Sequence, residues 1–156
     1  MHRSFRQATA ADVAPLARLI NDAFRSERFF ATADRTNPEG VREYIKKGVF
    51  LVTEDDGTLA GCVYLEPRGE RFYLGLLSVE PHLQRSGLGT FLMNAAEDYC
   101  RSRNARGIDL RIVNVRTELP AYYRRFGYKE SGTAPFPPEV KTKMPCHFVI
   151  LSKEFV

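Results

Sequence analysis

The stretch that decides the fold is Leu77-Ser78-Val79-Glu80-Pro81-His82-Leu83-Gln84-Arg85-Ser86-Gly87-Leu88-Gly89-Thr90. It begins as a β-strand that ends at a proline, and it continues through a polar Gln-Arg-Ser turn. After Gly87, apolar residues recur at spacings of three and four up to Tyr99, which predicts an amphipathic helix of about 15 residues. Two glycines, Gly87 and Gly89, therefore open the most clearly periodic of the predicted helices, directly after a strand and a tight turn.

The start of this helix has the properties of an anion-binding site. The first amides of a helix have no intrahelical acceptor and carry the positive end of the helix dipole. Glycine lets an anion approach the backbone, so a pyrophosphate could accept several of these amides at once, with Arg85 adding a cation at the rim. The dinucleotide-binding pattern G-x-G-x-x-G is excluded, because Leu92 stands where the third glycine is required. The alternative is a glycine-rich helix start that only permits close packing.

Outward from this stretch, the spacing of apolar residues predicts the rest of the fold. Three consecutive strands, at residues 49–52, 59–65 and 71–79, form an antiparallel meander with a hairpin turn at Asp55-Asp56-Gly57. Three further helices are expected: one at residues 10–24, one that starts after a cap at Asn37, and one at residues 118–126. Further strands are expected at residues 5–8, 108–114, 128–131 and 146–152. Residues 132–145 are typical of a proline-rich loop without regular structure. The sequence thus predicts one α+β domain, residues 1–156, around a mixed sheet.

Composition narrows the class of protein. The 156 residues include 23 Lys and Arg against 19 Asp and Glu; the net charge of +4 suits an anionic small ligand and argues only weakly for nucleic acid. No apolar run long enough for a membrane span and no secretory leader is found, and three widely spaced cysteines favour a reducing, cytoplasmic location. The cysteines and histidines share no metal-ligand spacing, so no metal site is expected. The sequence also lacks P-loop and G-x-S-x-G motifs, which excludes the corresponding nucleotidases and hydrolases.

Two motifs resemble those of a known superfamily. Gln84-Arg85-Ser86-Gly87-Leu88-Gly89 is similar to the Q/R-x-x-G-x-G/A signature of the GCN5-related N-acetyltransferases (GNAT). Tyr123-Arg124-Arg125-Phe126-Gly127-Tyr128 resembles the family's Y-x-K-x-G-F, with Arg for Lys and Tyr for Phe. The order of predicted elements follows the same fold over nearly the whole chain. The resemblance implies a layered α/β/α arrangement, in which a mixed, mostly antiparallel sheet of about seven strands is flanked by about four helices.

The resemblance also implies acetyl-CoA as donor, a primary amine of a small molecule or peptide as acceptor, and a set of site residues. The strand that ends at Leu77, Ser78 and Val79 would splay from the next strand, bind the pantetheine arm through its backbone and polarise the thioester carbonyl with an amide. The residues expected to hold the pyrophosphate are Gln84, Arg85, Ser86, Gly87, Leu88, Gly89 and Thr90. Asn114, at the end of the following strand, would contact the cofactor, although its spacing to Tyr123 is longer than in the commonest form of the family.

Tyr123 matches the family position of the general acid. A phenol, with a pKa of about 10, could donate a proton to the leaving thiolate; the alternative is an ordinary core aromatic. Tyr122 lies about 100° farther round the same helix and is expected to point elsewhere, into the core. An acceptor amine that is protonated at neutral pH gains from a general base, and Glu66, Glu118 or no residue at all could fill that role.

The acceptor pocket is expected between residues 25–36 and the loop at 132–145. Its aromatic wall could be formed by Phe29, Phe30, Tyr73 and Phe136, which could equally cover the core. Two other functions stay open: a non-catalytic acyl-CoA-binding or sensing module, and a nucleic-acid-binding domain, which is the least favoured because a one-sided basic helix is missing. We therefore expect a small-molecule or peptide partner, no nucleic acid and no membrane, and by analogy with related folds a homodimer.

Overall fold

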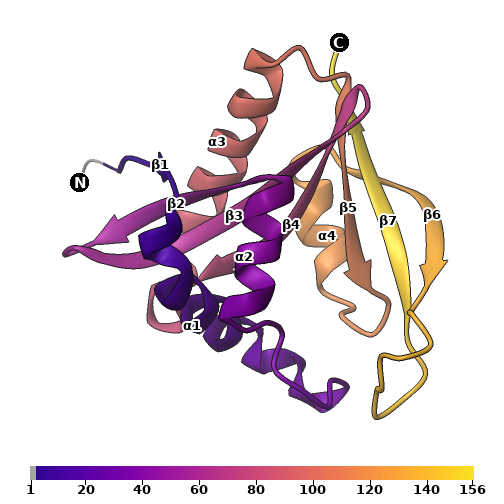
Figure 1. Ribbon diagram of the computed structural model, residues 1–156. Coiled ribbons are helices and arrows are strands. Elements are labelled where there is room, and N and C mark those ends of the chain that lie inside the picture. The colour runs from indigo at the N-terminus through magenta and orange to yellow at the C-terminus, as the bar shows by residue number, and fades with distance from the viewer. Residues whose placement is uncertain (1–2) are drawn as a thin grey trace.

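The computed structural model describes residues 3–156, which form a seven-stranded sheet in the order β1-β2-β3-β4-β5-β7-β6 (Figure 1). Neighbouring strands are antiparallel except β4 and β5, which run parallel. The strands are β1 (Arg6–Gln7), β2 (Val49–Asp55), β3 (Thr58–Arg68), β4 (Arg71–Val79), β5 (Gly107–Val113), β6 (Lys129–Pro135) and β7 (His147–Glu154). The helices are α1 (Val13–Ala23), α2 (Pro38–Lys47), α3 (Leu88–Ser102) and α4 (Leu119–Arg124), with 3₁₀ turns at Ala10–Asp12, Phe24–Phe29 and Pro81–Leu83. The predicted fold class is confirmed.

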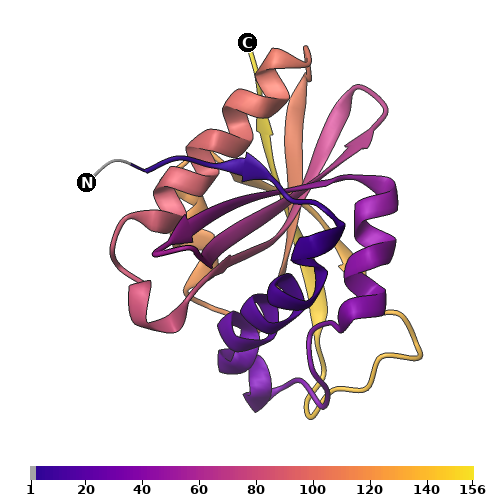
Figure 2. The same ribbon diagram turned by 60° about the vertical axis from the view of Figure 1, so that its left-hand side comes forward.

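The helices cover the sheet from two sides, with α1 and α2 on one face and α3 and α4 on the other (Figures 1 and 2). Successive side chains of a strand point to opposite faces. In β2, Phe50 and Val52 belong to the core under α1 and α2, whereas Leu51 between them belongs to the core under α3. Each of the three is at most 1% exposed. Two hydrophobic cores therefore enclose this part of the sheet.

The helix starts follow from local chemistry. Asn37 caps α2, because its Oδ1 accepts an amide of the first turn at 2.8 Å, and Pro38 fills the first helical position, where no amide donor is needed. Before α1, Asp12 accepts the Thr9 amide at 2.8 Å and is held by Arg6 at 2.8 and 2.9 Å. Both helix starts agree with the prediction, although residues 10–12 form a 3₁₀ turn rather than the first turn of α1.

The meander from β2 to β4 is confirmed. The turn between β2 and β3 uses Asp56 and Gly57, whose φ angles of 52° and 78° are tolerated by aspartate and glycine. Both strands extend beyond their predicted ends, because pairing with a neighbour continues past the apolar run. The first strand is shorter than predicted and consists of Arg6 and Gln7 alone.

β4 changes character halfway along its length. Leu76 has a φ of 52°, which L-residues rarely adopt, and β4 places Leu76 and Leu77 opposite the single residue Val63 of β3. Two residues facing one define a β-bulge. On its other edge, β4 pairs with β5 only from Phe72 to Leu74, after which the two strands separate (Figure 1). The predicted splay of these strands is confirmed.

The region after α4 is more regular than predicted. The sequence predicts a loop at residues 132–145, and this is wrong for residues 132–135, where β6 continues to Pro135 and pairs with β7. β6 is an edge strand, in which a proline need not remove a ladder hydrogen bond. Among the helices of residues 3–156, none combines the length and the apolar character that a membrane span requires.

Candidate active site

The turn before α3 leaves a row of backbone amides without acceptors. Gly87 is the N-cap of α3 and has a φ of 86°, a left-handed conformation that favours glycine. The first backbone bond of the helix runs from the Phe91 amide to the Gly87 oxygen at 3.0 Å. Within residues 3–156, no acceptor is bound by the amides of Arg85, Gly87, Leu88, Gly89 and Thr90. These amides lie at the positive end of the helix dipole, so the turn is suited to an anion.

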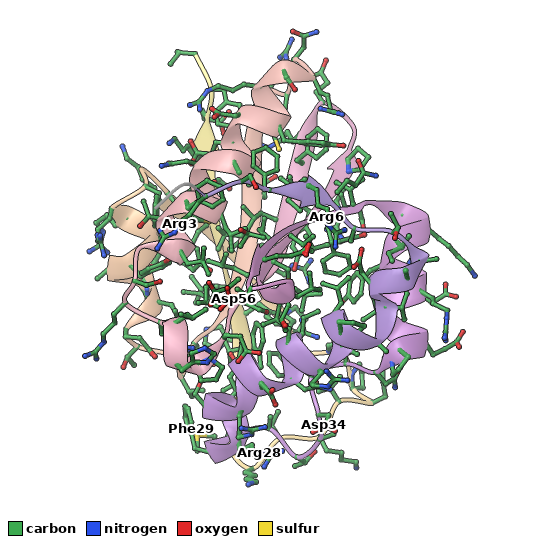
Figure 3. All side chains as sticks on the ribbon, turned by 90° about the vertical axis from the view of Figure 1, so that its left-hand side faces the viewer. Arg3, Arg6, Arg28, Phe29, Asp34 and Asp56 are labelled. Carbon is green, nitrogen blue, oxygen red and sulfur yellow. The ribbon has the colours of Figure 1, made fainter. Side chains whose placement is uncertain are left out.

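Two arginines flank this turn. Arg85, itself at a φ of 68°, is exposed, as the sequence-based prediction requires. Arg3 (Figure 3) donates to the Ser86 oxygen at 2.7 Å, and a Cβ built on Gly87 would lie 3.3 Å from its Nη1. The sequence gives no sign of Arg3, because it lies far from the turn along the chain. Gln84 stays close to the preceding strand through a long 3.4 Å contact between its Nε2 and the last carbonyl of β4.

Gly89 lies against Tyr122 of α4. A Cβ built on Gly89 would come within 2.7 Å of the Tyr122 hydroxyl, so glycine permits this close approach of the two helices. The Tyr122 ring is half-buried and packs edge-on against Tyr123 and Phe126. Tyr122 packs against the core under α3, as predicted, but it stays half-buried, and its hydroxyl meets the glycine turn at the start of α3.

Where β4 leaves β5, it presents an unpaired backbone edge. Beyond Leu74, β4 pairs with β3 alone, and this part includes the predicted residues Leu77, Ser78 and Val79. The Ser78 side chain is 1% exposed and donates to the Leu76 oxygen at 2.9 Å. The buried environment that holds this hydroxyl leaves Ser78 only its backbone for contact with a ligand.

Tyr123 combines a buried ring with an accessible hydroxyl. The residue is 9% exposed and packs against Tyr128. Within residues 3–156 its hydroxyl makes no hydrogen bond, yet no fully buried side-chain oxygen or nitrogen there lacks a partner, so the hydroxyl is not fully enclosed. Burial raises the pKa of Tyr123 well above its usual value, which keeps the phenol protonated at neutral pH. Arg116, Tyr73 and Glu27 are close enough to influence the same pKa.

A largely buried ion pair lies beside Tyr123, and it was missed in the sequence. Glu27 Oε2 and Arg116 Nη1 are 2.7 Å apart, and the two side chains are only 11% and 16% exposed. Burial raises the pKa of Glu27, and the charge of Arg116 opposes this effect. Glu118 also contacts Arg116, at 3.2 Å, but it is exposed. Since 89 positions separate Glu27 from Arg116, no local pattern could have indicated the pair.

Two other predicted residues are held by the protein itself. Glu66 accepts the Arg68 Nε at 2.7 Å and the Tyr64 hydroxyl at 2.8 Å. Burial acts to raise its pKa, but these hydrogen bonds outweigh burial and the pKa is lowered. Asn114 accepts the His147 amide through Oδ1 at 2.8 Å and so fixes the start of β7, while its Nδ2 makes no bond within residues 3–156.

The two segments expected to line the acceptor pocket lie side by side. Lys143 donates its amide to the Phe30 oxygen at 2.7 Å, and the Thr32 hydroxyl donates to the Lys141 oxygen at 3.0 Å. The aromatic residues form separate pairs rather than one wall: Phe29 with Phe30, Phe136 with Phe148, and Tyr73 beneath Arg68. Phe29 is 48% exposed (Figure 3) and does not cover the core, whereas Phe30 is 3% exposed and belongs to the core.

Metal and thiol chemistry involve none of these residues. Across residues 3–156, no group of three or more His, Cys, Asp or Glu side chains is placed to hold a metal ion. Cys62 and Cys100 are buried, and burial raises the pKa of each thiol to about 12. Such thiols are protonated and unreactive at neutral pH.

The larger cavity and the cavity with chemically suitable side chains are two different cavities. A cavity of about 380 Å³ lies at the C-terminal end of α3, where Tyr99 and Arg103 line it, at the opposite end of the helix from Gly87. A smaller cavity of about 190 Å³, lined by Tyr73 and Arg111, lies where β4 and β5 separate. The smaller cavity borders the last paired residues of β4 and β5, and Tyr73 in its wall is close enough to Tyr123 to influence the pKa of that phenol, so we place the candidate active site there.

Comparison with known proteins gives the same assignment as the geometry. The Acetyltransferase (GNAT) family model matches residues 14–128. An uncharacterized N-acetyltransferase of Bacillus subtilis (strain 168), YhfO, is 28% identical over 139 residues, covering 81% of this chain and 90% of that protein. Streptothricin acetyltransferase of Streptomyces lavendulae is 32% identical over 85 residues, which are 53% of this chain and 45% of that enzyme.

Solved structures share the fold of this chain. The crystal structure of Ard1 from Thermoplasma volcanium matches with a TM-score of 0.80 over 100% of this chain and 99% of that one, at 14% identity. At such low identity the match concerns the fold, whereas the family model matches the sequence itself over more than half of the chain. The chain belongs to the acetyltransferase (GNAT) family and is an acetyl-CoA-dependent N-acetyltransferase.

Proposed function

We propose that this enzyme transfers the acetyl group directly to a primary amine of a small molecule or peptide, with Tyr123 as general acid. The observation that carries the proposal is the Tyr123 hydroxyl, which makes no hydrogen bond within residues 3–156, is not fully enclosed, and is close to Tyr73, one of the last residues of β4 to pair with β5. A buried phenol with an open hydroxyl can deliver a proton to a group that enters this separation.

The proposed path of acetyl-CoA follows segments that are consecutive in the chain. The unpaired edge of β4 ends at Val79, and the row of amides from Gly87 to Thr90 follows within the next turn. A diphosphate bound by these amides can therefore run its pantetheine arm along β4 toward Tyr73. In this path, Leu77, Ser78 and Val79 act through their backbones and Arg85 and Arg3 supply positive charge. Asn114 remains a candidate for a lesser contact through Nδ2.

The chemistry requires one proton donor and one proton acceptor. The acceptor nitrogen attacks the thioester carbon, and its carbon–nitrogen bond forms as electrons move to the carbonyl oxygen. An amide of the β4 edge can stabilise that oxyanion. The carbon–sulfur bond then breaks, and the thiolate takes the phenolic proton of Tyr123, which solvent restores. The surplus proton of the nitrogen passes to a carboxylate.

Glu27 suits the role of this carboxylate better than Glu66 or Glu118. It is the buried one of the three, it lies near Tyr123, and its pKa is raised. A base with a raised pKa holds the proton that it removes more readily. Glu66 has a lowered pKa and Glu118 is exposed, so neither has these properties. Arg116 then keeps the Glu27 carboxylate in place.

The proposal is tested with Tyr123→Phe. We expect kcat to fall at least tenfold, since a general acid contributes about 10²–10⁴-fold, while the Kd for CoA stays within about twofold. The control is Tyr99→Phe at the far end of α3, which should change neither quantity. Equal losses of kcat and CoA affinity in Tyr123→Phe would make the residue structural, and thiol release from no amine of any class despite CoA binding would favour a non-catalytic acyl-CoA-binding module.

A further inference from the structure

The cavity at the separation of β4 and β5 has a basic lining. Its wall consists of Arg68, Tyr73, Asp109, Leu110, Arg111 and Ile150, around a volume of about 190 Å³. Arg68 comes from β3 and Tyr73 from β4, and the other lining residues come from β5 and β7. Leu110 and Leu151 belong to the core under α3, so their neighbours Arg111 and Ile150 point to the opposite face of the sheet. A volume of this size admits a small polar molecule or one residue of a peptide.

Tyr73 lines this cavity, and Gly75 makes room for its ring. A Cβ built on Gly75 would lie 2.9 Å from Cε2 and 3.2 Å from the hydroxyl of Tyr73, so the ring lies flat along β4 over Gly75. The ring thus points toward the bulge at Leu76. Within residues 3–156 the Tyr73 hydroxyl makes no hydrogen bond, and it is not among fully buried groups, because those all have partners. It is therefore available to a ligand.

The carboxylates around the cavity are already neutralised. Asp109 accepts both Nε and Nη2 of Arg71 at 2.8 Å, and it accepts the Ser152 hydroxyl at 2.6 Å. Glu66 accepts Arg68 at 2.7 Å. Neither carboxylate is free to bind a cationic ligand, because strong donors already bind each of them.

Two guanidinium groups beside Tyr73 lack such a partner. Arg111 lies 5.3 Å from the centre of the Phe148 ring, and Arg35 lies 5.5 Å from the centre of the Phe24 ring. Within residues 3–156, neither makes an ion pair or a hydrogen bond, although Arg35 is close enough to Glu27 to act on the pKa of that carboxyl. Arg68 adds its aliphatic and guanidinium surface over the Tyr73 ring at 4.2 Å.

The titration of Tyr73 indicates the same positive field. Burial raises the pKa of Tyr73, and Arg35, Arg111 and Arg68 each act to lower it. Three guanidinium groups from β3, β5 and the segment before α2 thus influence one hydroxyl. An electrically neutral or cationic acceptor would gain nothing from this arrangement, whereas an oxyanion would find donors on several sides.

We propose that the acceptor carries an oxyanion, a carboxylate or a phosphonate, in addition to its amine, and that Arg111 and Arg35 bind this oxyanion beside the Tyr73 hydroxyl. This inference rests on the proposed function, and it names the class of acceptor: a small amino acid, its phosphonate counterpart, or a peptide residue with a nearby carboxylate. The bound oxyanion orients the molecule so that its amine lies toward Glu27 and Tyr123. Arg111 is then a specificity-determining residue.

The test compares matched acceptors on wild type and on Arg111→Gln. The acceptors are a panel of α-amino acids, the carboxamide of each, and the aminophosphonate analogue of each, with thiol release from acetyl-CoA as readout. For the preferred side chain, we expect kcat/KM of wild type to be at least about tenfold higher for the carboxylate or the phosphonate than for the carboxamide. The Arg111→Gln variant should lose this preference through a higher KM for the anionic acceptor.

Two further variants make the outcome decisive. Arg111→Lys keeps the charge but loses the fork of donors, so it should show an intermediate preference. Arg18→Gln, on the exposed face of α1, is the matched arginine control and should retain the full preference. If carboxamides and anionic acceptors react equally well, or if Arg111→Gln keeps the preference, the inference is overturned while the proposed function stands. If no acceptor in any class is acetylated, the proposed function itself fails.

Discussion

The two halves of the sheet differ in how they are covered. In β2 and β3 both faces are enclosed by helices, and residues of opposite faces such as Phe50 and Leu51 are each 1% exposed. In β5 and β7 the face toward α3 and α4 is equally buried, with Leu110 and Leu151 each 2% exposed, while Arg111 and Ile150 on the opposite face remain accessible. β4 is the border between the two halves, and there the strands separate. The enclosed half supplies stability, and the candidate active site forms where the covering stops.

Truncating one apolar side chain in each half should give the largest effect. Leu51→Ala removes a side chain enclosed on all sides and should lower the free energy of unfolding by about 2–5 kcal/mol. Ile150→Ala removes a side chain of similar size from the open face and should cost no more than about 1 kcal/mol. Urea denaturation of both variants measures the difference, and similar losses would contradict the distinction between the two halves.

Removing the buried carboxylate of Glu27 should lower the catalytic activity. Glu27→Gln keeps the shape of the side chain but removes the base, so we expect kcat/KM to fall about 100-fold at neutral pH. In wild type, kcat/KM should decline as the pH falls through the raised pKa of Glu27, because the protonated carboxyl accepts no proton. This decline should be missing from the residual activity of the variant. The control is Glu118→Gln, and an equal loss there, or an unchanged pH profile in Glu27→Gln, would assign the base elsewhere.

Comparing Gly87→Ala with Gly57→Ala separates the effect on cofactor binding from the effect of backbone strain. Gly87 and Gly57 both have positive φ, and neither has close neighbours apart from the flexible end of Arg3 beside Gly87. Alanine at either position should cost about 1–2 kcal/mol of stability, since both turns hold the residue in the left-handed region. Only Gly87→Ala should weaken CoA binding, by about tenfold, the loss expected when one charge-assisted hydrogen bond is impaired. Calorimetric titration with CoA measures this, and an equal effect of Gly57→Ala would show that strain, not the amide row, is responsible.

The smallest effect is expected at the edge of the enclosed half. The hydrogen bonds from Arg6 lower the pKa of Asp12 to about 2, below its ordinary 3.8. A depressed pKa means that the ionised form stabilises the fold above pH 4, and that this contribution is lost as the pH falls from about 4 to about 2. Asp12→Asn should therefore cost about 1–2 kcal/mol at pH 7, with a difference from wild type that disappears near pH 2. Chemical denaturation at several pH values tests this, and a constant difference across that range would be inconsistent with linkage.

Much of the fold could be predicted because its signals are local. The Asn37 cap, the Asp56-Gly57 turn and the glycines before α3 are determined by neighbouring residues, and the structure confirms each. The hydrophobic period of β2 to β4 likewise gave the meander. Two motifs in the right order then indicated the family, and the family match over residues 14–128 confirms it.

The remaining features depend on contacts between distant parts of the chain. The Glu27–Arg116 pair, the Arg3 contact and the orientation of Tyr122 each require knowing which segments meet in space. The bulge at Leu76 had one overlooked signal, because Gly75 inside an apolar strand is typical of a bulge or of a close approach. The end of β6 was missed because an edge strand with exposed faces has no hydrophobic alternation.

A crystal structure of the protein with bound CoA tests the central claim most directly. We expect the diphosphate within hydrogen-bond distance of the amides from Gly87 to Thr90, the pantetheine arm along the unpaired edge of β4, and the thiol between β4 and β5 beside the Tyr123 hydroxyl. CoA located instead in the larger cavity at the C-terminal end of α3, or a thiol far from Tyr123, would contradict the account.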